Sequence, residues 1–65
     1  MSKRMQYVRE FTSLLSECLE AGIYTADVAS AAKWALVNDA LTIAKLDAHI
    51  SVLAARLQQH HRRAS

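Results

Sequence analysis

A long stretch from residue 26 to about residue 59 contains neither glycine nor proline, the residues that most often end a helix. Apolar or small residues occupy every seventh position of this stretch: Ala29, Leu36, Ile43, Ile50 and Leu57. A second series, displaced by three residues, includes Leu46 and Leu53. Apolar residues spaced by three and four mark one face of a helix with coiled-coil-like packing. The stretch therefore predicts one continuous helix over residues 26–60, about 50 Å long.

The residues before this stretch predict a shorter helix over residues 3–21. Its apolar face is formed by Val8, Phe11, Leu15 and Cys18, which recur at helical spacing. Gly22, the sole glycine of the chain, follows where a left-handed residue commonly ends a helix. Thr25 is a candidate N-cap of the second helix. The sequence thus predicts an antiparallel helical hairpin, one domain over residues 1–65, with a turn at residues 22–25 and a basic tail at residues 61–65.

The composition favours an all-α fold and excludes a disulfide framework. The chain has 65 residues, of which 52% are hydrophobic, with no proline and one cysteine. A single cysteine cannot form an internal disulfide, so we expect a reducing, cytoplasmic setting. No uncharged run approaches the roughly 20 residues that span a bilayer, so no membrane partner is expected.

The unequal lengths of the two predicted helices favour a homodimer. The shorter helix covers the longer one only to about residue 45, so the later apolar residues lack a partner within the chain. We expect a second copy to pack there and to give a four-helix arrangement. The predicted packing seam comprises Leu36, Ile43, Leu46, Ile50, Leu53 and Leu57. Trp34, Val37 and Leu41 form a second face, a candidate surface for packing or for binding another protein.

A break at Asn38 and Asp39 is the alternative to a continuous helix, because asparagine is a good N-cap. It would give a three-helix domain with a helix-turn-helix between residues 25 and 50. The absence of a turn glycine and the helix-favouring residues 33–37 favour the continuous helix instead. Asp39 would then be a polar residue within the seam.

No residue pattern indicates catalysis, a metal or a cofactor. His60 and His61 are adjacent and point about 100° apart on a helix, and His49 lies three turns away, so they do not form a chelating set. Cys18 lies on the apolar face, where a packing role is expected. The sequence contains no phosphate-binding loop, nucleophile elbow or zinc motif. We therefore expect a protein that is not an enzyme and that needs no cofactor.

Basic residues gather at both ends of the chain, whose net charge is +2. Arg56, Arg62 and Arg63 follow one another towards the carboxyl end, and Lys3 and Arg4 lie at the other end. Such residues suit the negative end of a helix dipole, but they are also candidate nucleic-acid contacts. No aromatic residue lies between them in the sequence to stack on bases.

The sequence therefore predicts a small regulatory or adaptor protein that acts by protein–protein binding as a helical homodimer. Its size and form are typical of accessory proteins of phages, plasmids and bacterial operons. The alternative is a nucleic-acid-binding regulator that uses the basic termini or a helix-turn-helix. Binding that weakens steeply with salt would favour the alternative.

Overall fold

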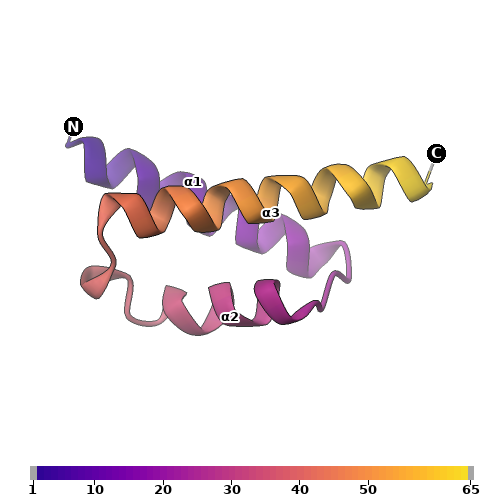
Figure 1. Cartoon of the computed structure of the whole chain (residues 1–65), viewed down its shortest axis with the longest axis horizontal. Coiled ribbons are helices and arrows are strands. Elements are labelled where there is room, and N and C mark those ends of the chain that lie inside the picture. Colours follow the sequence, from indigo (N-terminus) through magenta and orange to yellow (C-terminus); the bar gives the residue numbers. More distant parts are fainter. Residues whose placement is uncertain (1, 65) are drawn as a thin grey trace.

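Three α-helices and one short 3-10 turn make up the chain, which the computed structural model describes over residues 2–64, without the side chains of Asn38 and Ala64. The elements are α1 (Lys3–Glu20), α2 (Ala26–Ala35), the turn η1 (Asn38–Ala40) and α3 (Ile43–Ala64). All regular structure in the described residues is helical, so the predicted all-α class is confirmed. The chain reverses direction after α1 and again after α2, and α3 packs mainly on α1 (Figure 1).

Helix α1 begins and ends at local signals in the sequence. The Ser2 hydroxyl caps its start by accepting a hydrogen bond from the Met5 N–H at 3.2 Å. At its end Gly22 adopts a φ of 80°. The Gly22 N–H donates to the Leu19 carbonyl at 3.1 Å, and the Ile23 N–H donates to the Cys18 carbonyl at 3.0 Å. This pair of bonds is a Schellman motif, so the prediction of a helix end at Gly22 is confirmed.

The predicted continuous helix over residues 26–60 is wrong, because the chain leaves the helix after Ala35. The N–H groups of Leu36, Val37 and Ala40 instead donate to carbonyls three residues earlier, which tightens the backbone into 3-10 geometry. The alternative break at Asn38 and Asp39 is where the turn η1 forms.

Two residues after η1 explain why the helix does not continue. Leu41 is buried in the core, with 3% of its surface exposed, and its carbonyl accepts a hydrogen bond from the Arg4 guanidinium. Thr42 then starts α3, since its hydroxyl accepts from the Lys45 N–H at 3.2 Å in the manner of an N-cap. Burial of Leu41 and the cap at Thr42 outweigh the weak intrinsic helix preference of residues 36–42.

The break also gives the later apolar residues of the chain an internal partner. Leu46, Ile50, Leu53 and Leu57 are buried. The expectation that they lack a partner within the chain is therefore wrong: α3 is free to turn back and lie along α1 (Figure 1). The two earlier seam residues are not buried with them: Leu36 is 86% exposed, and Ile43, in the first turn of α3, is 38% exposed.

A single apolar core joins the three helices and both connections. Its buried members are Phe11, Leu15, Cys18, Ile23, Val28, Ala31, Leu41, Leu46, Ile50, Leu53 and Leu57. No polar or charged side chain is buried among those described. The functional groups of the described chain consequently lie on its surface.

Candidate functional site

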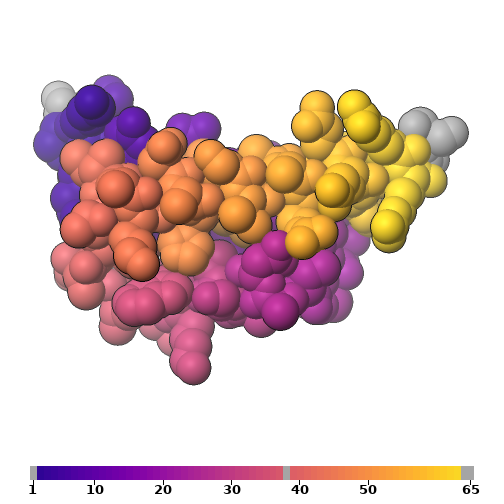
Figure 2. Space-filling view, viewed as in Figure 1, coloured from indigo at the N-terminus to yellow at the C-terminus, as the bar shows by residue number. Residues whose placement is uncertain are grey.

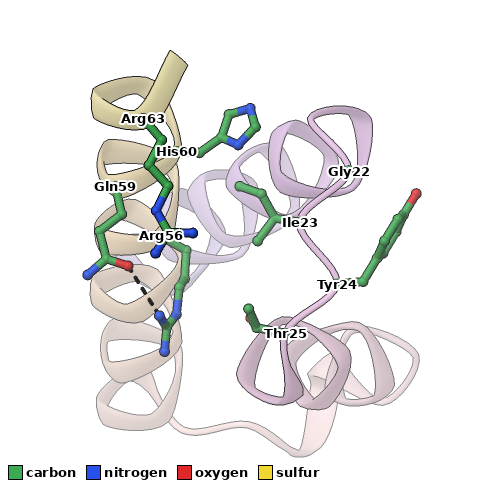
Figure 3. A pocket seen from close by; sticks show the side chains of 8 residues that line it. All are labelled: Gly22, Ile23, Tyr24, Thr25, Arg56, Gln59, His60 and Arg63. Atoms are coloured by element: carbon green, nitrogen blue, oxygen red, sulfur yellow. Dashed lines mark hydrogen bonds between the residues drawn. The ribbon is translucent and has the colours of Figure 1, made fainter. Parts of the chain in front are cut away.

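A pocket of about 430 Å³ lies between the α1–α2 connection and the last turns of α3 (Figure 3). It is lined by Gly22, Ile23, Tyr24, Thr25, Arg56, Gln59, His60 and Arg63, and we call it the basic pocket. Arg56, His60 and Arg63 share one face of α3, because they are spaced by four and three residues. Two guanidinium groups and one imidazole thus line the same hollow. Such an arrangement suits the binding of an anion.

Two side chains of the basic pocket, Ile23 and His60, point into the space between the connection and α3. In Figure 3, Ile23 points from the connection towards α3, and His60 points from α3 towards the connection. Arg63 extends back along α3 towards Arg56 and away from the carboxyl end of the helix (Figure 3). Its charge is therefore not directed at the terminal carbonyls, where neutralisation of the helix dipole would place it.

Arg56 is held in place by two neighbours. Its Nε donates to Asp27 Oδ2 at 2.8 Å, and its second nitrogen Nη1 donates to Gln59 Oε1 at 3.2 Å. Asp27 also accepts from the Thr25 hydroxyl and, at 3.0 Å, from the Val28 N–H. The hydrogen bond from Thr25 and that from Arg56 lower the pKa of the Asp27 carboxyl. Asp27 is thus the carboxylate that fixes one wall of the pocket.

Thr25 occupies the predicted N-cap position of α2, but its side chain does not cap the helix. It donates to Asp27 instead, and Asp27 accepts from the first turn. Thr25 therefore occupies the N-cap position, while the Asp27 carboxylate accepts the hydrogen bond from the first turn of α2.

Tyr24 adds an aromatic ring to the basic end of the molecule. Its side chain is 77% exposed, and its ring lies on the side of the connection that faces away from α3 (Figure 3). The sequence showed no aromatic residue among the basic ones, because Tyr24 is far from Arg56 and Arg63 in the chain. Only the folding of α3 alongside the α1–α2 connection brings them to one pocket.

A second exposed feature, at the end of α2, is apolar. Leu36 is 86% exposed, Val37 51% and Trp34 42%, and we call these three residues the apolar end surface. Leu41, predicted to belong to the same face, lies in the core instead. The reason is the helix break, which rotates residues after 37 away from the face they would share in a continuous helix.

The remaining predicted nucleic-acid contacts lie apart from the basic pocket. Lys3 and Arg4 begin α1, at the other end of the molecule, where Arg4 lines a hollow of about 190 Å³ together with Met5, Val8 and Asp39. Arg62 lies in the last turn of α3 but does not line the basic pocket. Space-filling atoms of this last part of α3 project beyond the body of the molecule (Figure 2). Of the predicted contacts, the fold therefore brings Arg56 and Arg63 into one pocket.

The histidines and the cysteine occupy different settings. His49 packs on Phe11, with ring centroids 5.5 Å apart, while the His60 and His61 rings meet edge to face at 6.1 Å. Within the described residues no three histidine, cysteine, aspartate or glutamate side chains are placed to hold a metal ion.

Cys18 is buried, and its thiol contacts the Leu53 carbonyl at 3.6 Å. Burial raises the pKa of this thiol, which favours its unreactive form.

Comparisons with protein-family models, with curated proteins and with solved structures found no match to this chain. None of the helices in the described part combines the length and apolar character that crossing a membrane requires. The basic pocket and the apolar end surface are the two exposed features of the described chain that bear on function.

Proposed function

We propose that this chain is a small, non-enzymatic regulatory or adaptor protein that acts by protein–protein binding as a helical homodimer. The apolar end surface is the proposed interface between the two copies. The observation that carries the proposal is the 86% exposure of Leu36 between two further exposed apolar side chains, Trp34 and Val37. Exposed leucine, valine and tryptophan side chains that are close in the chain are typical of interaction surfaces.

The exposed area of the chain also supports association with a second copy. Folded monomers of 7.2 kDa expose about 4,100 Å² by the general scaling of surface with mass. This chain exposes 4579 Å². A domain of this size buries only about 60% of its unfolded surface, so it gains much from covering apolar area with a second copy.

The charges beside the apolar end surface favour a copy of the same chain as the occupant. Lys33 precedes the surface in the sequence and Asp39 follows it, and both are exposed. In a two-fold contact, if Lys33 of one copy meets Asp39 of the other, then Asp39 of the first copy also meets Lys33 of the second, so the same ion pair can form twice. Opposite charges at the rim would fix the register of the two copies.

The oligomeric state tests the proposal. Sedimentation equilibrium of the wild type should give twice 7.2 kDa, and Leu36→Glu should give 7.2 kDa with its helical circular dichroism retained. Tyr24→Ala, which removes an exposed ring at the opposite end, is the matched control and should remain a dimer. A wild type that sediments as a monomer, or a Leu36→Glu variant that remains a dimer, contradicts the proposal.

Charge reversal distinguishes a copy of this chain from a different partner. Lys33→Glu and Asp39→Lys should each weaken dimerisation by a factor of about two to five, because like charges then face each other at the rim. The double variant should restore it, since the opposite charges are exchanged. Failure of the double variant to restore dimerisation would contradict the proposed pairing of Lys33 of one copy with Asp39 of the other.

The alternative of a helix-turn-helix has less support from the geometry. A DNA-binding helix-turn-helix joins its helices with a turn of three or four residues. Here residues 36–42 join α2 to α3 and include the turn η1. Arg56, His60 and Arg63 of α3 do not belong to that motif, because they line the basic pocket.

A further inference from the structure

We propose that the basic pocket binds the phosphodiester backbone of a single-stranded nucleic acid, with a base stacked on Tyr24. Arg56, His60 and Arg63 would face a phosphate, and the Tyr24 ring would receive a base of the strand where it leaves the pocket. The inference concerns a site within one chain, so it stands independently of the homodimer.

The charge and the size of the pocket fit a phosphate group. Two guanidinium groups and an imidazole line it, against one carboxylate, Asp27, that is already bonded to Arg56. No carboxylate pairs with Arg63 among the residues that the structure describes. The pocket volume of about 430 Å³ lies within the usual range of ligand sites, about 300–1,000 Å³.

Part of the anion site is fixed before any ligand arrives. Arg56 is held by Asp27 at 2.8 Å and by Gln59 at 3.2 Å, so little side-chain freedom is lost when it meets a phosphate. Arg63 reaches back along α3 to the same hollow (Figure 3). The two guanidinium groups thus follow one another along one face of α3, where the phosphodiester backbone of a strand would run.

The aromatic ring selects single-stranded nucleic acid among phosphate-bearing ligands. Non-specific binders of single strands combine a positive groove with exposed aromatic rings on which bases stack. Tyr24 belongs to the connection that lines the pocket, its side chain is 77% exposed, and its ring lies on the side of that connection that faces away from α3 (Figure 3), where a strand that crosses the connection would meet it. In a duplex the bases are already stacked on one another, so a base gains less free energy from stacking on a single exposed ring.

Fluorescence anisotropy with a labelled single strand about 12 nucleotides long tests the pocket. The wild type should bind at about 50 mM salt and weaken by at least tenfold at about 200 mM. Arg63→Gln should weaken binding severalfold and lower the slope of log affinity against log salt by about one. Arg9→Gln makes the same charge change on α1 and should have a smaller effect. Equal losses in the two variants would overturn the site, as would absence of binding at low salt.

Substitutions of Tyr24 test the stacked base. Tyr24→Phe should retain the affinity, whereas Tyr24→Leu should weaken binding about fivefold or more without changing the salt slope. An unchanged affinity for Tyr24→Leu would overturn the stacking contact. Because these variants alter no charge, they separate stacking from general electrostatic attraction.

Competition identifies the source of the anion. Unlabelled single strand should displace the probe, whereas inorganic phosphate or poly-glutamate at equal charge concentration should not. Displacement by phosphate would assign the pocket to a free phosphate, and displacement by poly-glutamate would assign it to an acidic protein segment. Either result overturns the nucleic-acid inference. The Leu36→Glu variant should bind like the wild type if the pocket acts within one chain.

Discussion

The side chain of Arg56 in α3 donates through Nε to Asp27 Oδ2 in the first turn of α2, at 2.8 Å. This ion pair joins α2 to α3, and its Arg56 lines the basic pocket. About a third of each side chain is exposed, so water and salt screen the attraction. Its role is therefore to position Arg56 more than to hold the fold together.

The ion pair predicts how acid affects stability. The pKa of Asp27 is lowered on folding, so its carboxylate stabilises the fold at pH values above its unfolded pKa of 3.8. This stabilisation disappears as the pH falls through the lower folded value. Urea unfolding should show the wild type more stable than Asp27→Asn at neutral pH, with the difference shrinking in strong acid. Asp47→Asn is the control at neutral pH, because this exposed carboxylate has no described partner.

Two adjacent residues of α3 differ in burial and therefore in their expected effect on stability. Leu53 is fully buried, whereas Val52 is 38% exposed. Leu53→Ala should lower the free energy of unfolding by about 2–5 kcal/mol, which is a large part of the stability of a domain of this size. Val52→Ala should cost less than about 1 kcal/mol. Urea or thermal unfolding followed by circular dichroism measures both, and equal losses would contradict the observed orientation of α3.

The start of α3 depends on Thr42. Thr42→Ala removes the hydroxyl that accepts from the Lys45 N–H and should cost about 1 kcal/mol. Thr42→Ser and Thr42→Asp keep a capping oxygen and should retain most of the stability. A Thr42→Ala variant as stable as the wild type would mean that the Thr42 cap does not stabilise the start of α3.

The thiol of Cys18 should report opening of the core. Because it is buried and its pKa is raised by that burial, Ellman's reagent should react with it far more slowly in the native chain than in urea. Leu53→Ala should accelerate the native reaction, because loss of the buried leucine side chain leaves a cavity in the core that contains Cys18 and makes opening of that core easier. Val52→Ala serves as the matched control and should leave the rate nearly unchanged.

Local signals were sufficient to predict the helical class and the end of α1. Gly22 can adopt a positive φ without strain, and the apolar spacing of Phe11, Leu15 and Cys18 fixes the face that α1 buries. The basic character of Arg56 and Arg63 was also evident in the sequence. These features depend on residues close in the chain, which is why a pattern can predict them.

Only the tertiary structure decided where the second long stretch breaks and which residues meet. Local propensity weakly favours a continuous helix, and burial of Leu41 in the core together with the cap at Thr42 outweighs it. The same turn sends α3 back along α1, which buries Leu46, Ile50, Leu53 and Leu57 within the chain and leaves Leu36 exposed. It also carries Arg63 to the α1–α2 connection beside Tyr24. Contacts between residues so far apart depend on the free energy of the whole core, which no local spacing of residues encodes.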